Sequence, residues 1–151
     1  MSTEIVLQIR SDPALAGYRD TIMIVQNNHF VYVCPAAGGP NHRQPYRFGA
    51  GPWDQRYGQI APGSYSYVLV EHHRYGLAPL IAGGGQVVSR VPNPNHDGAK
   101  YLTEIFIHKG DSPGWRGSAG CPTVHPLFWR GFQYFFNPGD AGTFSVIDCP
   151  S

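Results

Sequence analysis

Glycine and proline recur so often along this chain that they limit the length of every regular element it can form. The 151 residues include 19 glycines and 14 prolines. Proline lacks the backbone donor that helix interiors and central strands need, and glycine favours turns. The chain also has nine tyrosines and eight phenylalanines, which pack well on pleated surfaces. We therefore expect a mostly β fold of short strands joined by many turns.

Length and composition predict a single folded domain over residues 1–151. Hydrophobic residues make up 42% of the chain, which is enough for a core, and the formal net charge is +1 without a block of like charge. This pattern does not predict nucleic-acid binding. The apolar runs are shorter than the roughly 20 residues of a membrane span, and residues 1–10 lack the pattern of a secretory signal. We expect no transmembrane segment and no signal peptide.

Alternating apolar residues predict strands along most of the chain. The predicted strands span residues 5–9, 21–26, 30–34, 64–71, 86–91, 104–108 and 143–147. The pair Asn27-Asn28 indicates a hairpin turn, and residues 75–85, which end in three glycines, are expected to form a flexible connection. Apolar spacing predicts an amphipathic helix over residues 125–136, with its aromatic row in the core. Residues 137–139, Asn-Pro-Gly, would end it.

The three cysteines are Cys34, Cys121 and Cys149, an odd number that cannot pair completely within one chain. No Cys-x-x-Cys spacing indicates a structural zinc site. A disulfide between Cys34 and Cys149 that leaves Cys121 free remains open.

Residues 107–121 contain the strongest indication of chemistry. His108 closes a buried-type strand, and Cys121 follows 13 residues later, after a glycine-rich loop and before the predicted helix. A thiolate is a good nucleophile, and the helix N-terminus would lower the thiol pKa. The imidazole would take the proton and pass it to a leaving amine. The amides of Gly120 and Cys121 would form an oxyanion hole, because Gly120 lets the backbone approach the substrate.

Three short motifs give the chain a likeness to a known family. His-x-Gly at 108–110, Ser-x-Gly-Cys at 118–121 and the Gly-Thr-x-x-x-Ile strand at 142–147 resemble the catalytic domain of the L,D-transpeptidases. Residues 57–65 resemble the family's Thr-Pro-x-Gly-x-Phe stretch. The resemblance covers about residues 20–148, and only 107–121 is specific.

The resemblance implies an L,D-transpeptidase-like mixed β-sandwich with a catalytic groove and one amphipathic helix after the catalytic cysteine. It implies that Cys121 is the nucleophile and His108 the base, that the Lys109 backbone carbonyl orients the ring, and that no cofactor or metal is needed. Around these residues, several others are candidates for supporting the loop or binding substrate. They are Ser118, Gly110, Trp115, Tyr101, Thr123 and Arg116.

Two departures from the family pattern concern substrate binding. Ala119 stands where the family usually has histidine, and Pro122-Thr123 stands where it has an apolar residue followed by arginine. That arginine helps to hold substrate, so we expect Arg116 to supply the charge from the same loop. The shorter spacing between His108 and Cys121 suggests a more open groove.

The resemblance implies acyl transfer on peptidoglycan stem tetrapeptides, with release of the terminal D-Ala through a thioester. Water as acceptor would give L,D-carboxypeptidase activity, and an amine would give transpeptidation or D-amino-acid exchange. Because no signal peptide is visible, we expect delivery to the periplasm or cell wall by another route, as an antibacterial effector or phage-associated enzyme. Such a toxin would call for a cognate immunity protein as partner.

Other interpretations stay open at this stage. The chain could be a catalytically silent module of the same fold that binds stem peptides or a partner. A different class of cysteine endopeptidase is disfavoured, because its cysteine usually precedes its histidine. Cys121 could be a small buried apolar residue, and His108 an ordinary strand-end histidine. The pair His72-His73 does not predict a metal site, because neighbours on a strand face opposite sides, although one of them could line the groove.

Overall fold

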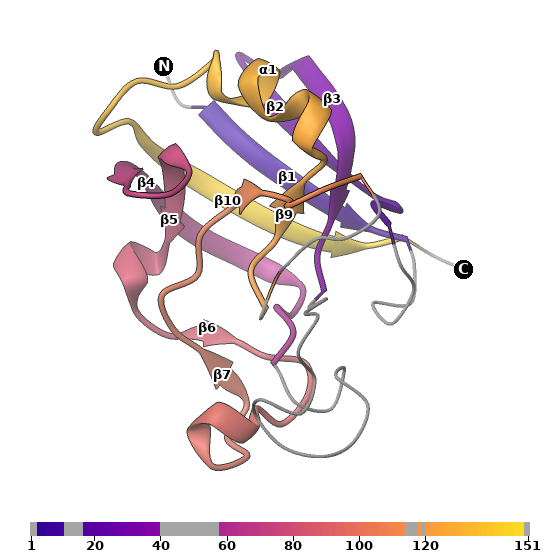
Figure 1. Ribbon diagram of the computed structural model, residues 1–151, viewed down its shortest axis with the longest axis vertical. Helices are drawn as coiled ribbons and strands as arrows, with labels where there is room; N and C mark the ends of the chain where they lie inside the picture. Colours follow the sequence, from indigo (N-terminus) through magenta and orange to yellow (C-terminus); the bar gives the residue numbers. More distant parts are fainter. Residues whose placement is uncertain (1–2, 11–16, 40–57, 114–117, 119, 150–151) are drawn as a thin grey trace.

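The computed structural model describes residues 3–10, 17–39, 58–113, 118 and 120–149 (Figure 1). Its strands are β1 (Thr3–Ile9), β2 (Asp20–Gln26), β3 (His29–Ala37), β4 (Gly63–His72), β5 (Gly76–Ile81), β6 (Val87–Val88), β7 (Tyr101–Leu102), β8 (His108–Lys109), β9 (Thr123–Val124) and β10 (Ala141–Asp148). Its helices are α1 (Trp129–Gln133) and the 3₁₀ turns η3 (Ala82–Gly84), η4 (Pro94–His96) and η5 (Pro126–Phe128). The prediction of a mostly β fold is confirmed.

Eight strands form one mixed sheet in the order β5-β4-β10-β1-β2-β3-β9-β8. The pairs β1–β10 and β8–β9 are parallel, and the other neighbours are antiparallel. β6 and β7 form a separate two-stranded sheet. The large sheet is nearly closed, because the chain just before β8 bonds to the opposite edge strand, β5. We call this junction of the two edges the seam.

The seam is formed by the stretch predicted as a strand over residues 104–108. Ile81 donates its amide to Ile105, Ile107 donates to the carbonyl of Pro79, and Phe106 bridges to Leu80. The chain then changes partners at β8, which pairs with β9. The prediction was right that Ile105, Ile107 and His108 are buried, but it was wrong for Glu104, which is exposed with a φ of +56°. Of the predicted strand, only His108 belongs to a named strand.

The hairpin between β2 and β3 is confirmed. Asn27 and Asn28 have φ of 51° and 61°, the left-handed values that a tight hairpin turn requires and that asparagine tolerates. The inward faces of the neighbouring strands alternate as expected, so that Ile5, Ile22 and Ile24 are fully buried. All three cysteines are free, so Cys34 and Cys149 form no disulfide with each other.

The predicted helix over 125–136 is wrong in its extent and in part of its core face. η5 forms first, and α1 begins only at Trp129 and lies over the β2–β3 hairpin (Figure 1). Trp129 and Phe132 point into the core, whereas Leu127 is 80% exposed. The difference arises because the side chain of His125 accepts the Leu127 amide and caps a 3₁₀ turn, which sets a different helical phase.

Residues 75–85 do not form the expected flexible connection, because most of them belong to β5. Pro79 is compatible with this strand since its carbonyl, not an amide, makes the contact to Ile107. The predicted strand at 86–91 is reduced to the two residues of β6, and the strand β9 was not predicted. None of the helices in the described part of the chain has the length and apolarity needed to cross a membrane.

Candidate active site

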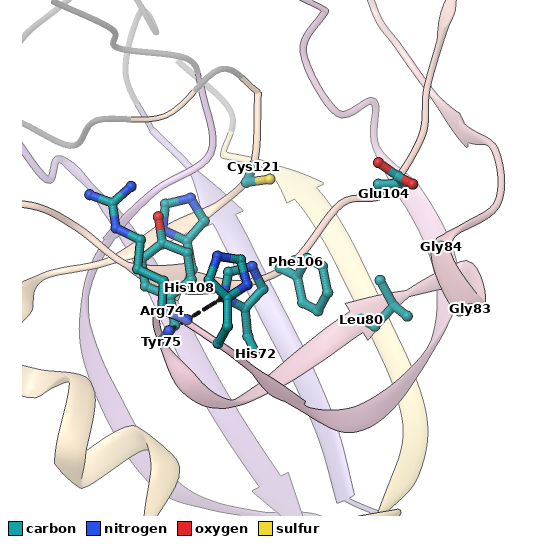
Figure 2. A pocket seen from close by; sticks show the side chains of 11 residues that line it. His72, Arg74, Tyr75, Leu80, Gly83, Gly84, Glu104, Phe106, His108 and Cys121 are labelled. Atoms are coloured by element: carbon teal, nitrogen blue, oxygen red, sulfur yellow. Dashed lines mark hydrogen bonds between the residues drawn. The ribbon is translucent and has the colours of Figure 1, made fainter.

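A pocket of about 740 Å³ opens at the seam, and both residues of the predicted catalytic pair line it (Figure 2). Its walls come from the turn after β4, from β5 and η3, from the seam segment and from the loop before β9. They comprise His72, His73, Arg74, Tyr75, Leu80, Gly83, Gly84, Glu104, Phe106, His108 and Cys121. The fold therefore brings His108 and Cys121, which are 13 residues apart, to one cavity with residues of the 72–84 region.

His108 is held in one orientation by its backbone and by its ring. Its amide donates to the carbonyl of Pro122, and its Nδ1 lies 2.8 Å from the carbonyl of Lys109. A carbonyl can only accept, so Nδ1 carries the proton and Nε2 keeps the lone pair. The ring stacks on Tyr75 at 4.3 Å between centroids and 13° between planes. Nε2 is therefore the atom available to act as a base.

The environment of His108 keeps its ring neutral. Burial lowers its pKa to about 4, and nearby Arg74 and His72 act in the same direction. The Lys109 hydrogen bond and the charge of Asp111 raise the pKa but only partly offset the effect of burial. A neutral imidazole is the form that can accept a proton.

Cys121 is partly exposed to the pocket, and its thiol is protonated at neutral pH. Burial raises the thiol pKa to about 11, while a backbone hydrogen bond from Phe106 opposes this shift. The expectation that a helix N-terminus lowers this pKa is wrong. The residues after Cys121 form β9 and η5, and α1 begins only at Trp129.

The β8–β9 ladder explains why the two side chains share a pocket. His108 pairs with Thr123, and Cys121 precedes Thr123 by two residues. This pairing brings the loop that carries Cys121 beside His108. The two side chains make no direct hydrogen bond to each other within the described structure. Catalytic hydrogen bonds are often long before substrate binds, so this arrangement is compatible with proton transfer.

Ser118 organises the cysteine loop. Its hydroxyl donates to the Cys121 carbonyl at 2.6 Å and accepts the Gly120 amide at 3.1 Å. Ser118 is thus a loop hydroxyl rather than a partner of His108. The Gly120 amide, one of the two predicted oxyanion donors, is therefore already engaged by Ser118.

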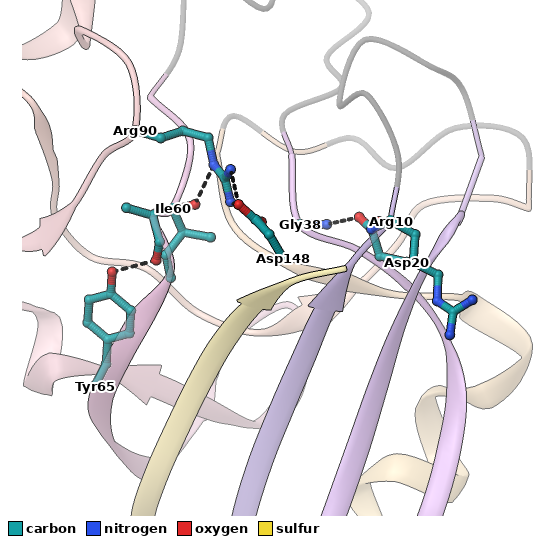
Figure 3. A network of polar contacts seen from close by, with 8 residues as sticks. Arg10, Asp20, Gly38, Ile60, Tyr65, Arg90 and Asp148 are labelled. Atoms are coloured by element: carbon teal, nitrogen blue, oxygen red, sulfur yellow. Dashed lines mark hydrogen bonds and ion pairs between the residues drawn. The ribbon is translucent and has the colours of Figure 1, made fainter. Parts of the chain in front are cut away.

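Gly120 brings the cysteine loop against the segment that resembled the family's upstream motif. Its φ is +134°, and a Cβ there would lie 3.0 Å from Leu102 and 3.2 Å from the Gly58 carbonyl. The chain after Gly58 is anchored in turn by Arg90, which donates to the Ile60 carbonyl and pairs with both carboxylate oxygens of Asp148 (Figure 3). The upstream segment therefore packs against the cysteine loop at Gly120.

The remaining predicted residues have varied locations. Thr123 is buried beside His108, and its hydroxyl has no hydrogen-bond partner among the described residues. Gly110 has no room for a side chain because Tyr18 lies against it. Tyr101 lies in β7 and stacks on His96, away from the lining of the large pocket. Arg116 and Trp115 lie outside the described residues.

Three residues that the sequence analysis missed contribute to the site. Tyr75 supports the His108 ring, Arg74 supplies a cation, and Glu104 supplies a carboxylate. No local pattern identifies these three residues, although the chain after the end of β4 at His72 is no longer bound to alternate between faces. For that reason His72 and His73 can both line the pocket and stack on each other. In the described part of the chain, no three His, Cys, Asp or Glu side chains group as metal ligands.

No protein-family model matches this chain, and no curated protein matches it. The fold and the site thus define a mostly β protein with a cysteine and a histidine lining one pocket.

Proposed function

We propose that this protein is a cysteine-dependent acyl transferase or hydrolase of the L,D-transpeptidase type, acting on peptidoglycan stem tetrapeptides. The observation that carries the proposal is the shared pocket of Cys121 and His108, with the Nδ1 proton of His108 held by the Lys109 carbonyl. A fixed tautomer and an open pocket are what general-base activation of a thiol requires. The motifs at 108–110 and 118–121 supply the choice of substrate.

In the proposed reaction, the sulfur of Cys121 attacks the carbonyl of the third stem residue. A C–S bond forms, the thiol proton passes to Nε2 of His108, and the Cys121 amide donates to the developing oxyanion. The C–N bond then breaks, and His108 gives its proton to the leaving amine of the terminal D-Ala. Water or an acceptor amine attacks the thioester, the C–S bond breaks, and the sulfur regains a proton.

The pKa values of Cys121 and His108 indicate which protonation states the two side chains have before substrate binds. With a thiol pKa of about 11 and an imidazole pKa of about 4, both groups are neutral at pH 7. The site is therefore a thiol beside a neutral base rather than a preformed ion pair, and proton transfer accompanies attack on bound substrate.

Incubation with defined muropeptides followed by mass spectrometry tests the proposal. We expect loss of one terminal D-Ala, a new cross-link or a D-amino-acid exchange product, depending on the acceptor. The matched control is Cys149→Ala, which removes a thiol that does not line the pocket. No product with any tetrapeptide, from a folded protein, would contradict the proposal.

A second candidate is a stem-peptide-binding module without turnover. The raised thiol pKa of Cys121 and the missing hydrogen bond to His108 favour it. The rate at which a small thiol reagent labels Cys121 separates the enzyme from the silent module. An enzyme should show labelling of Cys121 that falls with His108→Ala, whereas a silent module should show equally slow labelling in both proteins.

We also propose that the protein acts in the cell wall as an antibacterial effector or phage-associated enzyme with a cognate immunity protein. This role would follow from the proposed reaction on stem peptides, because cleavage of stem peptides in the wall would weaken it. Expression directed to the periplasm should cause lysis or misshapen cells for the wild type and not for Cys121→Ala. Harmless wild-type expression would argue against this role.

A further inference from the structure

The large pocket carries opposite charges at its two ends. Arg74 and Glu104 both line it, and Figure 2 shows them on opposite sides with Cys121 between them. Phe106 and Leu80 line the space between the two ends. A ligand that spans this pocket would therefore meet a cation at one end, apolar surface in the middle and an anion at the other end.

The hollow continues beyond the sulfur on the side of Glu104. A second pocket of about 280 Å³ is lined by Cys121 and Glu104 together with residues of η4 and the β7 loop, including Asn93 and Thr103. Cys121 and Glu104 are the residues that line both pockets among the described ones. The cysteine therefore lies along a groove, with room for substrate on each side.

Arg74 is placed for binding an anion by the turn that ends β4. The Nδ1 of His72 accepts the Arg74 and Tyr75 amides, which fixes the turn, and the guanidinium lies 5.4 Å from the centre of the Tyr75 ring. The Nη2 atom of Arg74 pairs with Asp111 at 3.2 Å, but the Arg74 side chain is 60% exposed. An ion pair whose guanidinium is exposed is weak and uses only part of the guanidinium, so a substrate carboxylate can bind the remaining donors.

Glu104 is held at the opposite rim in an uncommon conformation. Its φ is +56°, in the left-handed region that costs energy for a residue of this kind, and its amide donates to the carbonyl of Gly84. Its exposed carboxylate forms no ion pair with any described residue. The fold thus keeps an unpaired carboxylate at the groove rim at some cost in stability.

We propose that Arg74 and Glu104 select a zwitterionic peptide: Arg74 binds the free α-carboxylate of the leaving residue, and Glu104 binds an amine on the acyl-donor side. The direction rests on the proposed function. His108 protonates the leaving amine, and its ring stacks on Tyr75, beside Arg74. The leaving residue therefore lies on the Arg74 side, and the acyl-donor part of the substrate lies on the Glu104 side.

Binding to the full-length Cys121→Ala protein tests this assignment without turnover. Four synthetic tetrapeptides combine a free or amidated terminal carboxylate with a free or acetylated side-chain amine, and calorimetry gives their affinities. We expect amidation and acetylation each to weaken binding about fivefold to tenfold, as a charged hydrogen bond at a partly exposed site would. Arg74→Gln should abolish only the effect of amidation, and Glu104→Gln only the effect of acetylation.

Matched controls are Arg10→Gln and Glu4→Gln, which change the same charges away from both pockets. The assignment is overturned if Arg74→Gln and Glu104→Gln still bind the free peptides more tightly than the blocked ones. It is also overturned if the two control variants lose this preference to the same extent. Turnover by the wild type separates this failure from failure of the proposed function. Release of the terminal residue without the expected discrimination would refute only the groove assignment, and discrimination without turnover would refute only the catalytic proposal.

Discussion

The central ladder and the seam of the same sheet are built in different ways. In the ladder, β1 pairs with β10 and β2 along nearly its whole length, and the inward side chains are aliphatic or aromatic. At the seam, β8 and β9 have two residues each, and the contact with β5 is a single bridge with flanking hydrogen bonds. The seam also contains the buried ring of His108 and the unpartnered hydroxyl of Thr123.

This difference teaches where such a fold can place chemistry. In a complete ladder the backbone donors and acceptors are paired and the inner face is packed with side chains. Such a region has neither free polar groups nor space for a ligand. A seam of short pairings leaves a hollow between the two edges, and side chains from both edges converge there. Stability should therefore depend mainly on the ladder and activity mainly on the seam, and the following substitutions test that division.

The largest expected effect is on activity at the seam. Cys121→Ala should lower turnover of a stem tetrapeptide by about 10⁴-fold or more, because no covalent intermediate can form. The thermal midpoint should change little, since only a partly exposed sulfur is lost. Mass-spectrometric rates and thermal unfolding of the same samples measure both quantities. A variant that keeps its activity, or that unfolds, would break the proposed division.

The next largest effect is on stability in the ladder. Phe144 of β10 is fully buried, and Phe144→Ala should lower the free energy of unfolding by about 3–5 kcal/mol. Phe106→Ala at the seam should cost less, because that ring is only partly buried. Urea unfolding of the two variants gives the comparison. Equal losses would show that the seam contributes to stability as much as the ladder does.

The third expected effect is a dependence of the free energy of unfolding on pH, caused by His108 at the seam. The pKa of His108 is lowered from 6.5 to about 4 in the folded protein. Between these values the unfolded chain binds a proton that the folded chain does not, so stability falls as the pH falls. The loss begins near pH 6.5, approaches about 3 kcal/mol near pH 4 and then levels off.

The measurement is the free energy of unfolding of the wild type minus that of His108→Gln, from pH 7 to pH 4. Other titrating groups cancel in this difference, so it should decrease by about 3 kcal/mol over that range. A difference that stays constant would mean that the ring is not buried in its neutral form.

The contrast between the two regions also explains how much the sequence could predict. The ladder strands and the Asn27-Asn28 hairpin follow from alternation and turn chemistry, which are local signals. β5 was missed because the three glycines after it and Pro79 within it suggest a connection. The strand is defined by its pairing with β4 and by its bonds to the seam segment, 24 to 28 residues later, and these are tertiary contacts.

The site was predictable only in the residues that carry reactive groups. His108 and Cys121 could be identified from their types and spacing, whereas Tyr75, Arg74 and Glu104 reach the pocket through tertiary contacts that no local pattern encodes. The pKa of Cys121 was expected to fall because a helix was predicted directly after it. Burial determines the actual direction, and burial depends on the closure of the sheet.

The smallest expected effect compares two serine hydroxyls, one in each region. Ser118 is 1% exposed, and its hydroxyl bonds both the Cys121 carbonyl and the Gly120 amide. Ser64 of β4 is exposed, and the one hydrogen bond of its hydroxyl to a described residue is with the Ser145 hydroxyl at 3.3 Å. Ser118→Ala should cost about 1–2 kcal/mol of stability, because it leaves buried backbone groups unpaired. It should also lower turnover severalfold, since the loop that carries the Cys121 amide loses its brace. Ser64→Ala should change neither quantity, because water replaces the lost contact. If both variants behave alike in urea unfolding and in turnover, the Ser118 hydroxyl does not position the loop, and the oxyanion role of the Cys121 amide loses its structural support.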